Sequence, residues 1–226
     1  MEYKMPDNEI TLDNKTVTFN MLASEYYLWF EGDGKLVFDI EVCAFREIMP
    51  LLPGPWLEVG VGSGRFAQAL GIMKGVDPAE GLLKIAQSRG IDVSLSSGEK
   101  CPFDECSFGT VFLIVTLCFV DSPDLVLKEA HRILAPGGKV ALGLVLKESP
   151  WGKFYEQKKL TGHRFYKHAT FYKCNEIVTL LTQAGFSVNK VFSTLFQKPQ
   201  KANDIELPRE GYDPNAGFTI IVAGKK

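Results

Sequence analysis

A glycine-rich turn carries the residues whose types and spacing could do chemistry. The stretch LEVGVGSGRF, residues 57–66, places Gly60, Gly62 and Gly64 in alternation after a short apolar run, with Glu58 two residues before the first glycine. Glycine adopts positive φ angles without strain and lets the backbone approach a ligand closely. Such a turn at the end of a strand is typical of a site for a nucleotide-like ligand.

The spacing of these glycines disfavours a dinucleotide. The dinucleotide fingerprint is G-x-G-x-x-G, with a diphosphate on the helix N-terminus, whereas the residue three positions after Gly62 is Arg65. Glu58 would add like charge beside a diphosphate, and it suits a ligand that carries a cationic amino group. A nicotinamide-dependent dehydrogenase is therefore the weaker alternative.

Asp77 is the second marker, and it follows the next apolar segment in the sequence GVDP. An isolated Asp is most often a turn or capping residue. At the end of a parallel strand, however, a carboxylate can accept hydrogen bonds from both hydroxyl groups of a ribose. The glycine turn and Asp77, in order at successive strand ends, together predict a nucleoside-containing ligand.

The composition predicts a folded domain without a global preference for nucleic acid. The chain has 226 residues, is 46% hydrophobic and carries a formal net charge of −2, so no strong field attracts a polyanion. Its five cysteines form no C-x-x-C pair, which predicts free thiols, no metal site and a cytoplasmic location. The polar N-terminus is no signal peptide, and the longest apolar run, 111–120, is about half the length that spans a bilayer.

Strands alternate with helices through most of the chain, which predicts an α/β fold. We expect a Rossmann-like three-layer sandwich with a seven-stranded, mostly parallel sheet, an N-terminal helical cap and an insert after strand five. The last two strands follow each other without a helix, so one strand should be antiparallel. The expected strands are 56–60, 73–77, 92–96, 110–116, 139–146, 187–196 and 217–224, and the expected helices are 20–30, 35–49, 64–71, 78–90, 122–134 and 175–186.

The whole chain, 1–226, is predicted to be one domain. Its parts are the cap (1–50), a ligand-binding core (51–146), the insert (147–174), which we call the lid, and a C-terminal helix with two strands (175–226). Residues 147–170 carry no clean periodicity. We expect Gly71 to end the first core helix, Pro136, Gly137 and Gly138 to end the helix at 122–134, and Asn175 to cap the last helix.

These motifs resemble those of the class I S-adenosylmethionine-dependent methyltransferases, in the small single-domain group. The segment LEVGVGSGRF is similar to the family's E/D-x-G-x-G-x-G motif, and GVDPAEGLLKIA resembles its ribose-binding strand end and the helix that follows. The resemblance continues through SSGEKCPFDECSFGTV, through VTLCFVDSPDLVLKEAHRILAPGGKVALGLV and through the late helix that ends in Ala-Gly-Phe. It therefore covers most of the chain.

The resemblance implies that S-adenosylmethionine is the cofactor and S-adenosylhomocysteine the product. Glu58 and the turn glycines would hold the methionine end, Asp77 the ribose, and Pro78 the adenine. Ser97 stands where the family usually has an Asp that contacts the adenine amino group, and a serine hydroxyl accepts more weakly. The implied cofactor-binding residues are Glu58, Gly60, Gly62, Gly64, Asp77, Pro78, Ser97, Gly98, Thr116 and Leu117, together with Tyr26 and Trp29 of an N-terminal aromatic cluster.

The sulfonium methyl group is already activated, so alignment of donor and acceptor supplies much of the rate and no catalytic base is required. The lid is expected to set specificity. Its segment 147–173 has a formal charge of +5, from seven basic and two acidic residues, and several aromatic residues. We expect an anionic or aromatic small-molecule acceptor, with His163, Tyr166 or His168 as the base if one is used. The alternatives are a non-catalytic cofactor-binding module and a methyltransferase that acts on RNA or protein.

Overall fold

The structure is a computed structural model, and it describes residues 16, 32 and 34–226. The expected helix at 20–30, with Tyr26 and Trp29, lies outside the described residues. The helices are α3 (Lys35–Ile48), α4 (Arg65–Leu70), α5 (Glu80–Ser88), α6 (Pro123–Ile133), α7 (Pro150–Leu160) and α8 (Cys174–Gln183), with short 3-10 turns η1 (Met49–Leu51) and η2 (Tyr166–His168). The strands are β1 (Trp56–Val59), β2 (Lys74–Asp77), β3 (Asp92–Leu95), β4 (Phe108–Ile114), β5 (Leu134–Leu144), β6 (Phe186–Thr194), β7 (Arg209–Glu210) and β8 (Phe218–Lys225).

One sheet organises the described chain, in the strand order β3-β2-β1-β4-β5-β8-β6-β7. The five strands from β3 to β5 are parallel, and β8 is antiparallel to both β5 and β6. The α/β class and the antiparallel pairing of the last two long strands are confirmed. The sheet has eight strands rather than the expected seven, because two residues of the segment expected to be a connection pair with β6 as β7.

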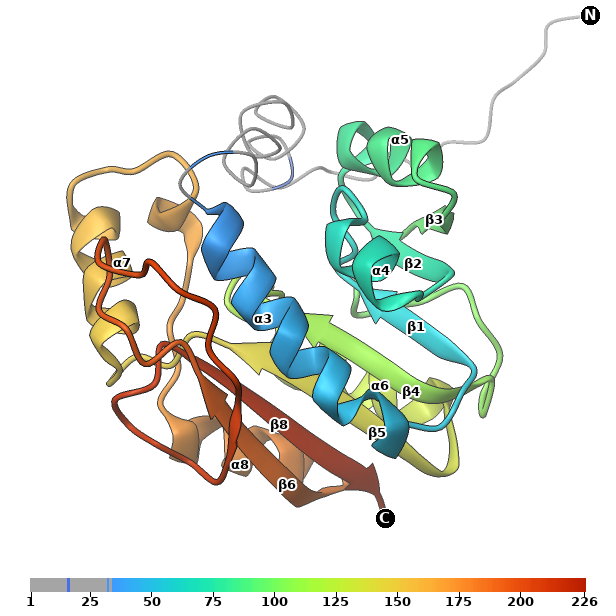
Figure 1. The fold of residues 1–226 in the computed structure, drawn as a ribbon. Helices are drawn as coiled ribbons and strands as arrows, with labels where there is room; N and C mark the ends of the chain where they lie inside the picture. Colours follow the sequence, from blue (N-terminus) through green and yellow to red (C-terminus); the bar gives the residue numbers. More distant parts are fainter. Residues whose placement is uncertain (1–15, 17–31, 33) are drawn as a thin grey trace, which may run out of the picture.

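Helices cover both faces of this sheet and make three layers (Figure 1). Helices α3 and α4 contact each other on one face, and α6 and α8 contact each other on the other. Strand β4 is buried along its whole length, as expected for a central strand covered on both faces. Two large apolar clusters lie between the sheet and the helices on its two faces. One surrounds Phe45 and Phe112, and the other surrounds Leu113 and Leu127.

Two expected helix boundaries were wrong. Helix α6 ends at Ile133, before Pro136, because Leu134 already pairs with Phe108 and the chain passes directly into β5. Gly137 (φ +74°) then sits where the pairing of β5 with β4 changes register. Helix α8 begins at Cys174, with Lys173 at the N-cap, two residues before the expected cap Asn175.

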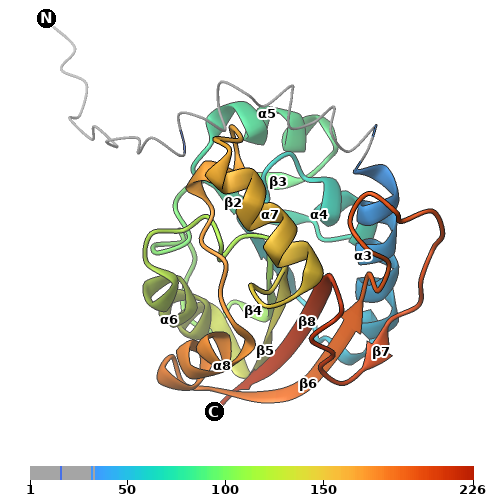
Figure 2. The same ribbon diagram turned by 90° about the vertical axis from the view of Figure 1, so that its left-hand side faces the viewer.

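The lid contains the helix α7 and the turn η2, which the sequence pattern did not reveal. Helix α7 starts at the N-cap Ser149, whose hydroxyl oxygen accepts from the Gly152 backbone N–H at 2.9 Å. The Trp151 indole N–H donates to the Gln197 carbonyl at 2.7 Å, which ties the helix to the chain after β6. Figure 2 shows α7 crossing the end of the sheet. The lid therefore lies over the strand ends where a ligand would bind.

Candidate active site

The glycine turn joins β1 to α4 and is locked to the end of β2. The Gly62 N–H donates to Asp77 Oδ2 at 2.9 Å, and the Gly60 and Val61 N–H groups donate to the Val76 carbonyl. Gly60, Gly62 and Gly64 all have positive φ angles, from 53° to 75°. A Cβ at Gly60 would lie 2.6 Å from Thr116 Oγ1, so only glycine fits this turn against β4.

Asp77 organises the turn through both of its carboxylate oxygens. While Oδ2 accepts from Gly62, Oδ1 accepts from the Ala79 N–H at 2.8 Å. Burial raises the pKa of Asp77 to about 6, and the hydrogen bonds from Ala79 and Gly62 oppose this rise. Each carboxylate oxygen has a second lone pair, so these contacts leave acceptor capacity for ligand hydroxyl groups.

The strand ends around Asp77 gather the other residues assigned to the nucleoside. The Ser96 N–H donates to the Asp77 carbonyl at 3.2 Å, which places the end of β3 beside that of β2. A Cβ at Gly98 would lie 2.9 Å from Val59 Cγ1, so this glycine packs closely on β1. Pro78 directly follows Asp77 and Ser97 is exposed. These residues share one edge of the sheet, outside the lining of the cavity described next.

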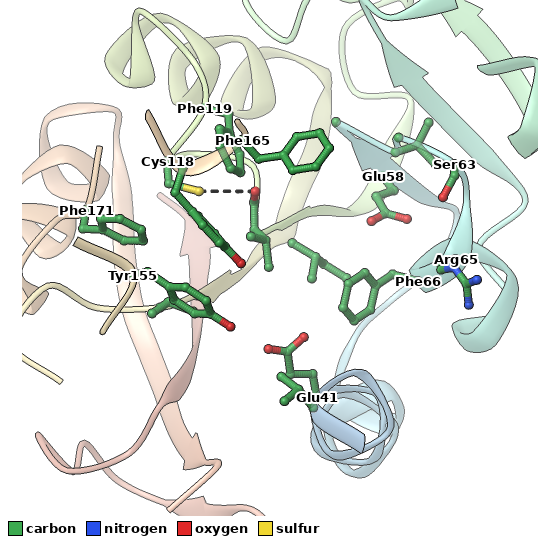
Figure 3. A pocket seen from close by; sticks show the side chains of 18 of the residues that line it. Glu41, Glu58, Ser63, Arg65, Phe66, Cys118, Phe119, Tyr155, Phe165 and Phe171 are labelled. Carbon is green, nitrogen blue, oxygen red and sulfur yellow. Dashed lines mark hydrogen bonds between the residues drawn. The ribbon is translucent and has the colours of Figure 1, made fainter. Parts of the chain in front are cut away.

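A cavity of about 220 Å³ opens between the glycine turn, α3 and the lid. Its floor is formed by Gly60, Gly62, the last residue of β4 and Cys118 of the segment that follows, and its far wall comes from the lid. Figure 3 shows the carboxylates of Glu58 and Glu41 directed into it from β1 and α3. The cavity is therefore continuous from the turn to the lid.

Glu58 is almost completely buried, with 1% of its surface exposed, and lines this cavity. One carboxylate oxygen is hydrogen-bonded by the Ala67 N–H, while Oε2 is buried without a hydrogen-bond partner. Burial, together with the negative charge of Asp77, raises the pKa of Glu58 well above its ordinary range. A buried acceptor of this kind needs a donor, and a cationic amino group would supply it.

The structure places the remaining described residues of the sequence prediction in four environments. His163 and Tyr166 line the cavity, whereas His168 lies on η2 without lining it. The Thr116 hydroxyl donates to the carbonyls of Val59 or Ile114, each at 3.1 Å, and its side chain packs on Gly60. The Leu117 side chain is fully buried in the apolar cluster under α6.

Sequence reasoning missed Glu41, which is 6% exposed and lines the cavity from α3. Burial raises its pKa to about 8, and no hydrogen bond or cation among the described residues offsets that shift. Its carboxylate in turn raises the pKa of the buried Tyr155 hydroxyl, after burial itself. The sequence did contain an indication of this position. Glu41 lies four residues from both Val37 and Phe45, which places an acidic residue inside the apolar stripe of the helix.

The basic residues of the lid do not face this cavity. None of the seven lines it. Lys158 lies over the Phe154 ring at 4.8 Å, Lys159 donates to the Ala169 carbonyl, and Lys147 pairs with Glu156 at 3.4 Å. Three of the seven basic residues of the lid therefore make contacts within the lid itself.

Comparison with known proteins agrees with this geometry. A family model described as a methyltransferase domain matches residues 57–142. An S-adenosylmethionine-dependent methyltransferase of Thermotoga maritima, named as a possible histamine N-methyltransferase, is 38% identical, with a TM-score of 0.88 over 94% of this chain and 100% of that chain. An uncharacterised protein of Methanocaldococcus jannaschii is 36% identical over 92% of this chain and 98% of its own length. An uncharacterised protein of Mycobacterium tuberculosis is 37% identical over 89% of this chain and 71% of its own length.

Among the described residues, no helix has both the length and the apolar character needed to cross a membrane.

Proposed function

We propose that this chain, which belongs to the class I S-adenosylmethionine-dependent methyltransferases, transfers the methyl group to a small-molecule acceptor. The observation that carries the proposal is the cavity of about 220 Å³, which runs from the glycine turn to the lid. A cavity that buries its ligand between a sheet edge and a lid suits a small molecule better than a macromolecule.

The residues present fit the cofactor. The unpartnered Glu58 Oε2 matches the amino group of its methionine part, and Gly60 and Gly62 have no side chain to keep a ligand away from the backbone of the turn. Asp77 would accept from the ribose hydroxyls with its remaining lone pairs, while Pro78, Ser97 and Gly98 would border the adenine. When bound, the cofactor supplies an electrophilic methyl group.

The chain's own contribution is alignment and exclusion of water. In-line displacement requires the acceptor atom on the far side of the methyl group from sulfur, and a lid that fixes this geometry contributes rate without acid–base chemistry. Phe119, Phe165 and Phe171 line the cavity and limit the access of water to it. The name of the Thermotoga maritima relative, which gives histamine as its possible acceptor, supports a small-molecule acceptor for this chain as well.

The test supplies the protein with methyl-labelled cofactor and two fractions of a cell extract. One fraction holds metabolites below about 1 kDa, and the other holds RNA and protein. We expect label in the small-molecule fraction, and we expect the Glu58→Gln variant to transfer little in either fraction. Label found only in RNA or protein would overturn the proposal, and label in neither fraction would favour a non-catalytic binding module.

A further inference from the structure

We propose that Glu41 binds the amino group of the acceptor, and that the acceptor is therefore an amine with an aromatic or apolar body. This inference rests on the proposed function and names the substrate class of the same cavity. It is carried by the position of the buried Glu41 carboxylate, which no other described residue hydrogen-bonds, opposite a wall of aromatic rings.

Glu41 is a poor structural residue where it stands. The neighbouring stripe positions Val37, Ala44, Phe45 and Ile48 are all buried and apolar. A carboxyl group among them loses its hydration, and no described hydrogen bond or cation compensates. An apolar side chain of similar size would fold better at this position. Glu41 is thus an ionisable group that lines a cavity and contributes nothing to the packing of the helix. Such a group indicates a contact with a ligand.

The wall facing Glu41 consists of aromatic rings from the lid. Tyr155 and Tyr166 have ring centroids 4.4 Å apart, and Tyr155 stacks on Phe171 with an interplanar angle of 10°. Figure 3 shows the Tyr155 hydroxyl on the side of the cavity that Glu41 enters. Aromatic faces bind apolar bodies and stabilise an ammonium group near them. A carboxylate and aromatic rings around one space thus form a site for an organic amine.

The charges around the cavity disfavour an anionic acceptor. Two carboxylates, Glu41 and Glu58, enter the described cavity. The described lining also contains Arg65, whose guanidinium lies well apart from Glu41 in Figure 3, and His163. Burial and the charge of Lys158 lower the pKa of His163, which disfavours its cationic form. An ammonium group in the cavity would favour the ionised form of Glu41, whereas an anionic acceptor would oppose it and would meet no cation beside Glu41 among the described residues.

The transfer step balances with Glu41 in this role. The bound ammonium group first gives a proton to the Glu41 carboxylate, which leaves a lone pair on the amine nitrogen. The nitrogen gives this lone pair to the methyl carbon, and the carbon–sulfur bond breaks with its electron pair left on sulfur. The product leaves as the methylated ammonium ion, and Glu41 passes the proton that it took to water. No oxidant or further reactant is needed.

The inference is tested by titrating probe compounds into the protein saturated with S-adenosylhomocysteine. The probes are two arylalkylamines, 2-phenylethylamine and tryptamine, with 2-phenylethanol and 3-phenylpropionate as uncharged and anionic matches. The variants are Glu41→Gln, which keeps the shape, and Glu47→Gln, a control on the exposed face of the same helix. We expect at least one amine to bind on the order of 10-fold more tightly than its matches, as a charge-assisted contact predicts.

In the Glu41→Gln variant this amine preference should be lost, while Glu47→Gln keeps it and both variants bind S-adenosylhomocysteine as the wild type does. Failure of both amines to bind, tighter binding of 3-phenylpropionate, or an unchanged preference in Glu41→Gln would overturn the role of Glu41. The labelled-methyl assay tests methyl transfer, whereas these titrations test only binding. If the amines bind through Glu41 but no methyl group is transferred to any small molecule, the proposed function fails and the assignment of Glu41 stands.

Discussion

Replacing Glu41 by glutamine should stabilise the ligand-free protein, and the gain should grow as the pH rises. Glutamine keeps the shape of the side chain and cannot ionise. The buried carboxyl group of the wild type must stay protonated or be charged inside the apolar stripe of α3. The variant therefore isolates the effect of one ionisation on the free energy of unfolding.

The magnitude follows from the pKa of Glu41, which burial raises from 4.5 to about 8. Between these values the unfolded chain has released a proton that the folded protein still holds, so stability falls with rising pH. Below pH 4.5 Glu41 is protonated in both states and does not reduce the free energy of unfolding. Above the folded-state pKa of about 8 the reduction has reached its full size. Each pH unit in this interval is worth about 1.4 kcal/mol, so the group removes about 3 kcal/mol between pH 5 and pH 8.

Urea unfolding at pH 5, 6, 7 and 8 measures this effect for the wild type, Glu41→Gln and the exposed-face control Glu47→Gln. The free energy of unfolding of Glu41→Gln minus that of the wild type should grow by about 3 kcal/mol over this range. The control should follow the wild type at every pH. Parallel profiles for Glu41→Gln and the wild type would refute the reasoning, because they would mean that the carboxylate is hydrated or paired in the folded protein.

Three further outcomes test the cofactor side of the cavity. Glu58→Gln should weaken the binding of S-adenosylhomocysteine about 10- to 100-fold, since a charge-assisted hydrogen bond is lost. A Kd that calorimetry finds unchanged would contradict the role of Glu58. Gly60→Ala should lower the free energy of unfolding by about 2–4 kcal/mol, because the new Cβ meets the Thr116 side chain at a positive φ angle; a loss below about 1 kcal/mol in urea unfolding would show that the turn can relax. Asp77→Asn should speed hydrogen exchange at the Gly62 N–H, since an amide nitrogen cannot replace a carboxylate oxygen as acceptor; exchange as slow as in the wild type would show that Asp77 does not hold the turn.

The cofactor turn was predictable because its pattern is local. Gly60, Gly62 and Gly64 must be glycines for their φ angles, and Glu58 and Asp77 stand at fixed places beside them. Strand alternation likewise predicted the parallel core, because buried strands and their covering helices each leave a periodic trace. The short strand β7 was missed because two residues are too few to carry any period.

The acceptor side was less accessible to sequence reasoning because its residues come from distant segments. Glu41 and Tyr155 meet only when the lid folds back over α3, and neither belongs to a motif. The charge of the lid favours an anionic acceptor, whereas Lys158 and Lys147 contact other lid residues and do not line the cavity. An acid inside an apolar helix stripe favours the amine that we propose, and such an acid can be recognised in a sequence wherever the helix period is clear.

The glycine turn and the lid differ in how freely their residues can change during evolution. Donor recognition depends on backbone that close packing at Gly60 holds in one conformation, so most substitutions there would damage the fold. Acceptor recognition, as we propose it, depends on side chains that enter the cavity from α3 and α7, and Glu41 in particular makes no hydrogen bond to another described residue. Evolution can therefore change the acceptor in one step while the donor stays the same. Proteins that share this turn need not share a substrate, and the residue aligned with Glu41 is where the difference should be read.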